Sequence, residues 1–157
     1  MAEAPHYEIE FYEDDEGNEP ALAFMRSLSG VKKRAIGVAL NEVLQYLGPN
    51  VAEGNFGRNL GGGLYEFRLD QDAEQILRRS GKEPKREPDE GKILLRVFFH
   101  PHGNKIILLL SGYDKGERTS KAHQQEQIDA ARKLLGRWKE RAKLKAPSVR
   151  KSGKRKP

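Results

Sequence analysis

The sequence contains no cysteine, so neither a disulfide framework nor a thiolate metal site is possible. Its four histidines are too scattered to form a set of metal ligands. No apolar run approaches the length of a membrane span, and residues 1–16 lack the basic and apolar regions of a signal peptide. We therefore expect a soluble, cytoplasmic protein with no cofactor and no membrane partner.

Positive charge is concentrated at the C-terminal end of the chain, which has a formal net charge of +6. Residues 137–157 hold ten Lys or Arg and one Glu, whereas residues 1–19 hold eight acidic residues and no Lys or Arg. The remaining residues, 20–136, have 19 basic and 14 acidic side chains, a net charge of +5. A mildly basic body with a basic tail suits a polyanionic partner such as nucleic acid. Terminal charge runs can equally serve solubility alone.

The N-terminal part of the sequence predicts one strand and two helices. Tyr7–Tyr12 alternates apolar and mostly acidic residues, as a half-exposed edge strand does. A helix from Pro20 to Leu28 has a proline in its first turn, and a second helix from Val31 to Leu47 carries an apolar stripe that Gly48-Pro49 ends. We expect this helical hairpin to cover one face of a sheet.

Three strands are predicted to form an antiparallel meander over residues 64–69, 93–99 and 105–110, with turn residues between the last two. In the first of them, apolar residues face the core while Glu66 and Arg68 face water. The glycine-rich residues 50–63 lack the Gly-Lys-Ser/Thr of a phosphate-binding loop, so we interpret them as a flexible turn. Residues 71–91 predict an extended mobile loop, anchored only at Ile76-Leu77.

A last helix is predicted from a cap at Thr119 or Ser120 to about Lys143, with a heptad-like apolar stripe that must be buried somewhere. Residues 144–157 have the composition of a disordered basic tail. The sequence therefore predicts an α+β fold with a single domain over residues 1–143.

Three motifs in this order resemble the RelE/HigB-type toxins of bacterial and phage type II toxin–antitoxin systems: LYEFR at Leu64–Arg68, RVFF at Arg96–Phe99, and the run Ile107–Lys115. Phe24 and Leu28 match the first helix of the family, and the resemblance covers roughly residues 7–140. It implies a compact RelE/ParE-like domain. It also implies an endoribonuclease that cleaves messenger RNA on the ribosome. The implied partner is a cognate antitoxin, a small DNA-binding protein that covers the groove bearing Arg68 and Arg96 or packs near the last helix.

The sequence departs from the family pattern in three places. Gly116 follows Lys115 where the family has a second lysine, and Tyr113 stands where phenylalanine is common. Residues 71–91 and the basic tail are longer than the compact family domain needs. These departures concern the cleaving residues more than the fold.

Metal-independent RNA cleavage needs a proton acceptor for the 2′-hydroxyl, cations for the phosphorane and a proton donor for the leaving 5′ oxygen. Arg68 and Arg96 are the candidate phosphate ligands, because a guanidinium binds phosphate oxygens in a bidentate fork. Neighbouring cations would favour the neutral form of Lys115, which then transfers protons, with Tyr113 or His100 as the other participant. Glu66 shares a strand face with Arg68 and either orients it or acts as a base.

Other interpretations of the same residues remain open. Glu66 and Arg68 could simply pair, Tyr113 could be an aromatic residue at the edge of the core, and Trp138 is better explained as an anchor of the last helix than as a base-stacking platform. Two other functions also fit. One is ParE-like inhibition of DNA gyrase by protein contact, although grouped arginines favour RNA. The other is a catalytically degenerate member that binds RNA through its tail.

Overall fold

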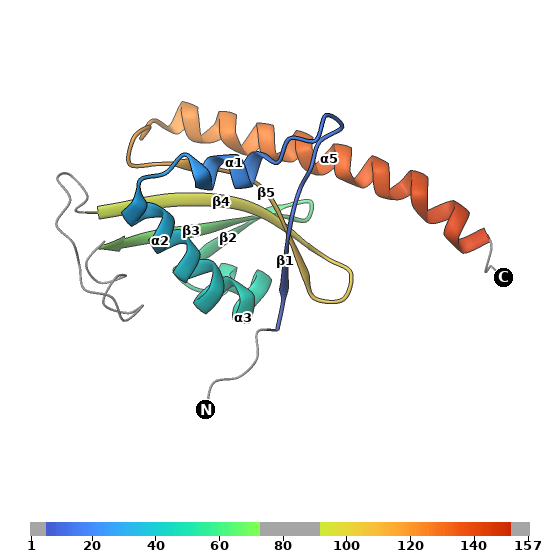
Figure 1. Ribbon diagram of the computed structural model, residues 1–157, viewed down its shortest axis with the longest axis horizontal. Coiled ribbons are helices and arrows are strands. Elements are labelled where there is room, and N and C mark those ends of the chain that lie inside the picture. The colour runs from blue at the N-terminus through green and yellow to red at the C-terminus, as the bar shows by residue number, and fades with distance from the viewer. Residues whose placement is uncertain (1–5, 73–91, 152–157) are drawn as a thin grey trace.

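The computed structural model describes residues 6–72 and 92–151 and has an α+β architecture, as the sequence predicts (Figure 1). A five-stranded mixed sheet has helices packed on both of its faces. The loop predicted over residues 71–91, with its anchors Ile76-Leu77, lies outside the described residues except for Gln71 and Asp72, which extend a strand. Residues 152–157 of the predicted tail lie outside them as well.

The sheet has the strand order β1-β5-β4-β3-β2. Its strands are β1 (Glu8–Phe11), β2 (Gly57–Gly61), β3 (Leu64–Asp72), β4 (Lys92–His102) and β5 (Ile106–Asp114). The predicted meander is present as β3, β4 and β5, which pair antiparallel, while β1 pairs parallel to β5 at one edge.

Strand β2, at the other edge, corrects the prediction of a flexible turn over residues 50–63. It pairs antiparallel with β3, and Gly57 makes this pairing possible because it lies in a very tight space. A Cβ atom at Gly57 would come within 2.5 Å of Val51 Cγ2 and 2.9 Å of the Glu66 carbonyl oxygen. A residue that is poor in strand propensity is thus required here by close packing.

One face of the sheet is covered by the N-terminal helices, as predicted (Figure 1). Helix α1 (Pro20–Arg26) is followed by α2 (Gly30–Ala39), which Ser29 caps by accepting a hydrogen bond from the Lys32 amide. The predicted second helix then continues as the π-helix η1 (Leu40–Leu44) and α3 (Gln45–Leu47). It ends at Gly48 with φ +55°, as the sequence indicates, and the 3₁₀ helix η2 (Gly48–Glu53) leads to β2.

The opposite face is covered by the long helix α5 (Lys121–Lys151). Its predicted cap is confirmed, because Ser120 Oγ accepts a hydrogen bond from the His123 amide at 3.1 Å. Ile128, Ala131 and Leu135 of α5 are buried in a second apolar cluster with sheet residues that include Leu64, Phe98 and Leu108.

Helix α5 corrects two expectations. It does not end near Lys143 but continues to Lys151. It also covers much of the sheet face that the sequence predicted to be wet, where Glu66 is 0% exposed and Arg96 is 1% exposed. Among the helices of residues 6–72 and 92–151, none is long and apolar enough to cross a membrane.

Candidate functional site

Five polar side chains from four neighbouring strands share the α5-facing side of the sheet. Across the strand pairs, Arg58 of β2 lies opposite Glu66 of β3, Arg68 of β3 lies opposite Arg96 of β4, and Arg96 lies opposite Tyr113 of β5. Paired residues point to the same face, and so do residues two apart on one strand, such as Glu66 and Arg68. We call Arg58, Glu66, Arg68, Arg96 and Tyr113 the arginine cluster.

Glu66 lies at the centre of the cluster and is completely buried. Its Oε1 atom is 3.5 Å from Arg58 Nε and 3.8 Å from Arg68 Nε, and the two arginine side chains are 45% and 31% exposed. Neither carboxylate oxygen accepts a hydrogen bond from the residues that the structure describes. The charge of Glu66 is therefore balanced by the arginines, while both of its oxygens can still accept hydrogen bonds.

Arg96 is the most deeply buried cation of the cluster and is fixed by Asp70. Its Nη1 atom lies 2.5 Å from Asp70 Oδ1, Nη2 lies 3.5 Å from Asp70 Oδ2, and Nη1 also donates to the Leu95 carbonyl at 3.1 Å. Arg96 is only 1% exposed, and the carboxylate of Asp70 compensates its buried charge. Arg96 Nε has no hydrogen-bond partner among the described residues.

Tyr113 is 5% exposed and closes one side of the cluster. Its ring stacks on Phe98 with centroids 6.0 Å apart, and the ring of His123 meets it edge-on at 5.4 Å. Burial raises the pKa of the Tyr113 phenol; the charge of Glu66 acts in the same direction, and Arg96, Arg58 and Arg68 oppose it. The hydroxyl is thus a neutral donor near physiological pH, and it has no hydrogen-bond partner in the described chain.

Three residues of this region were missed by the sequence analysis. Arg58 was assigned to a turn, Asp70 was not singled out, and His123 lies on the first turn of α5, where no motif marks it. The Ser120 cap, which fixes where that turn begins, is the single sequence signal that could have indicated His123.

The structure does not bring His100 into the cluster. His100 is four residues along β4 from Arg96, about 13 Å away on an extended strand. Its Nδ1 donates to the Gly63 carbonyl at 2.6 Å and its ring packs against Trp138. Burial lowers the pKa of His100, the hydrogen bond to Gly63 opposes this shift, and the charges of Lys139 and His102 add to it. Its role in this structure is to hold the turn between β2 and β3.

Lys115 directly follows β5, two residues after Tyr113, and its amide donates to the Leu94 carbonyl at 2.9 Å. Its half-exposed side chain forms no hydrogen bond or ion pair with the part of the chain that the structure describes. Of the predicted cations, Arg68 and Arg96 lie on neighbouring strands together with Arg58, while the role of Lys115 stays a prediction.

A cleft of about 400 Å³ adjoins the cluster between α1, the end of β5 and the first turns of α5. Tyr113 and His123 line it, and an ion pair of 2.5 Å between Lys32 Nζ and Asp114 Oδ2 ties α2 to the end of β5 there. No three His, Asp or Glu side chains within residues 6–72 and 92–151 are arranged to hold a metal ion.

The arrangement offers cations for a phosphate, a carboxylate able to accept a proton and a neutral phenol able to donate one. No protein-family model and no curated protein sequence matches this chain.

Proposed function

We propose that this protein is a RelE/HigB-like toxin of a type II toxin–antitoxin system, acting as a metal-independent endoribonuclease on messenger RNA at the ribosome. The observation that carries the proposal is the position of Glu66. Within the part of the chain that the structure describes, a fully buried carboxylate without a hydrogen bond lies between two partly exposed arginines, next to a third arginine and a neutral tyrosine. A buried carboxylate grouped with arginines and a phenol on one face of a sheet offers the acid, base and phosphate-binding groups that a catalytic site needs.

In the proposed reaction, Glu66 removes the proton of an RNA 2′-hydroxyl, whose oxygen attacks the adjacent phosphorus. Arg58 and Arg68 bind the non-bridging oxygens and stabilise the charge that develops on the phosphorane. Tyr113 protonates the 5′ oxygen as its bond to phosphorus breaks. The products are a 2′,3′-cyclic phosphate and a free 5′-hydroxyl.

Arg96 has a different role from its two neighbours. Because it is buried and held by Asp70, its side chain keeps a fixed position and its charge reinforces the field at the phosphate. Arg58 and Arg68 are partly exposed, so they can rotate toward the phosphate and uncover Glu66.

The proposed partner is a cognate antitoxin, a small DNA-binding protein that covers the surface bearing Arg58 and Arg68. Its binding would shield the exposed guanidiniums and leave Glu66 inaccessible.

A non-cleaving RNA-binding protein is the second candidate. The observation that favours it is the same pair of contacts, because Arg58 and Arg68 could be permanent counter-ions of Glu66. Inhibition of DNA gyrase by protein contact is a third outcome, in which the cluster would have only a structural role.

The test is messenger RNA integrity in a reconstituted translation reaction. We expect discrete cuts with the wild type that are lost in Arg68→Ala and retained in Arg34→Ala, which removes an exposed arginine from α2 on the other face. Arg96 is left unchanged because truncating a buried, ion-paired arginine would destabilise the sheet. Intact RNA with all three proteins, with or without ribosomes, would overturn the proposal, and gyrase supercoiling would then be measured.

A further inference from the structure

Helix α5 divides into a balanced half and a strongly basic half. Residues 121–136 contain three Lys or Arg and two acidic residues, whereas residues 137–151 contain seven Lys or Arg and one Glu. Figure 1 shows that the C-terminal turns of α5 run past the edge of the sheet. Residues 142–151, which we call the arm, span about 15 Å of helix. Leu144 on the arm is 78% exposed.

Three of these cations recur at intervals of seven and four residues, which is the spacing of one helix face: Arg132, Lys139 and Lys143. We call them the cationic stripe. The first two fix α5 to the turn between β2 and β3. Arg132 donates to the carbonyls of Leu60 and Gly61 at 3.0 Å each, and Lys139 donates to the Gly62 carbonyl at 3.0 Å.

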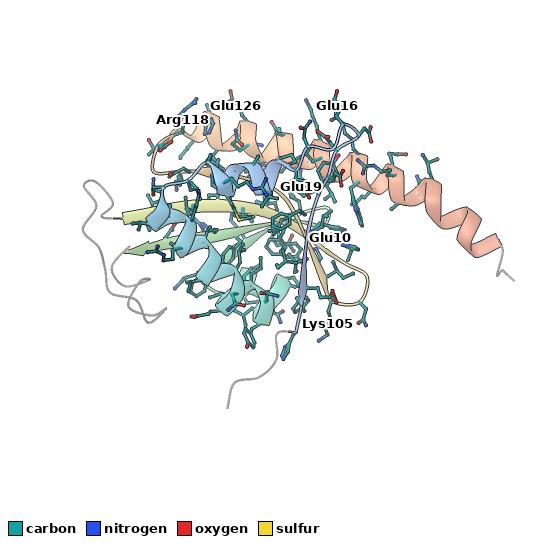
Figure 2. All side chains as sticks on the ribbon, in the orientation of Figure 1. Glu10, Glu16, Glu19, Lys105, Arg118 and Glu126 are labelled. Carbon is teal, nitrogen blue, oxygen red and sulfur yellow. The ribbon has the colours of Figure 1, made fainter. Side chains whose placement is uncertain are left out.

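The other flank of α5 is occupied by acidic residues. Arg141 donates to the Glu13 carbonyl at 2.9 Å and forms an ion pair with Asp15 at 3.3 Å. Arg137 lines a surface hollow together with Asp14, Asp15 and Glu16, and Figure 2 shows Glu16 on this side of α5. A polyanion would be repelled from that flank, so only the flank with the stripe is open to it.

The stripe is continuous with the arginine cluster. Arg58 lies on the edge strand β2, three residues before Gly61, and the turn that Arg132 and Lys139 hold is the one in which β2 ends. Positive side chains therefore follow one another from Arg68 and Arg58, along the β2 edge, to Lys143 on the arm.

We propose that the β2 edge and the cationic stripe form a binding surface for the RNA strand that flanks the scissile phosphate. This inference rests on the proposed function and adds a substrate-holding surface to it. RNA suits the surface better than an anionic membrane does. A membrane-binding helix presents a broad apolar face, whereas Leu144 is the one large apolar side chain strongly exposed on the described part of α5.

The experiment measures the affinity of the full chain for labelled oligouridylate as a function of salt. A Glu66→Gln background keeps the RNA intact. The test pair is Lys139→Gln/Lys143→Gln, and the matched control pair on the same helix is Lys133→Gln/Arg137→Gln, on the flank near the acidic residues. Since each neutralised phosphate contact on a single strand contributes about 0.7 to the slope of log K against log salt, the test pair should reduce the slope by about 1.4. The control pair should leave it unchanged.

Equal reductions by the two pairs would overturn the proposal, because the helix would then act only through its net charge. An unchanged slope in both pairs would overturn it as well. The proposal would also be overturned if the wild type bound phosphatidylserine vesicles more tightly than RNA and the test pair lost that vesicle binding. This experiment and the cleavage test can fail independently. RNA that stays intact with the wild type would refute the proposed cleavage, whereas the salt dependence of binding tests the cationic stripe alone.

Discussion

Replacing Glu66 with glutamine tests whether its carboxylate acts in catalysis or serves only as a structural counter-ion of the arginines. The substitution keeps the shape of the side chain and removes its charge. Glu66 is 0% exposed, and its Oε1 atom lies 3.5 Å and 3.8 Å from two guanidinium nitrogens. At an effective dielectric constant of about 20, one such contact corresponds to about 4 to 5 kcal/mol of attraction.

That attraction overstates the net contribution of Glu66 to stability. Burying the carboxylate without a hydrogen bond costs several kcal/mol, and Arg58 and Arg68 are exposed enough for water and salt to screen them. The opposing terms nearly cancel, so Glu66→Gln should change the free energy of unfolding by less than about 2 kcal/mol in either direction. Urea unfolding followed by circular dichroism measures this change.

The effect on cleavage should be much larger. Loss of a general base typically reduces the rate about 10²- to 10⁴-fold, which corresponds to about 3 to 5 kcal/mol in the transition state. Single-turnover cleavage of a labelled message on ribosomes measures the rate, with Glu42→Gln, an exposed glutamate of η1 on the other face, as the control. A stably folded Glu66→Gln protein that cleaves within tenfold of the wild-type rate would refute the role assigned to Glu66.

Four further predictions concern other residues. Tyr113→Phe should leave thermal stability unchanged or slightly higher, because the buried hydroxyl has no hydrogen-bond partner among residues 6–72 and 92–151, and should slow single-turnover cleavage; a large loss of stability would contradict this. Gly112→Ala should cost about 1 to 3 kcal/mol in urea unfolding, because its Cβ would lie 2.6 Å from Phe24 Cδ2. Gly136→Ala, with open space around it in the middle of α5, should instead stabilise by about 1 kcal/mol. Because the pKa of His100 is lowered in the native state, the unfolded chain binds the extra proton, and stability should fall as the pH drops below the ordinary histidine value of 6.5. This fall should be smaller in His100→Gln.

The sequence predicted the elements whose signals are local. The alternation of β1, the proline in the first turn of α1, the stop at Gly48 and the cap at Ser120 all appear where the residues indicated. Strand β2 could not be predicted in this way, because its sequence GRNLG contains two glycines and no β-branched residue. It is a strand because β3 offers it a partner and because Gly57 fits against Val51, which are both tertiary effects.

The same distinction explains the site. The strand alternation placed Glu66 and Arg68 on one face, and the register of the sheet adds Arg96 and Tyr113 to the same side. The burial of Arg96 depends on where the apolar stripe of α5 packs, which its spacing does not specify. Arg58 entered the cluster only through the pairing of β2 with β3.

The covering of Glu66 has a consequence for control of the proposed reaction. The free protein holds its carboxylate under Arg58 and Arg68, which neutralise it and keep it from water. These two side chains are also the cations of the cluster that are exposed enough to bind a phosphate. A guanidinium that turns toward a phosphate turns away from the carboxylate of Glu66. Binding of RNA and exposure of the base are then the same event, so the base becomes available only when a phosphate is in position. An antitoxin that holds both guanidiniums without offering a 2′-hydroxyl would block this event at its first step.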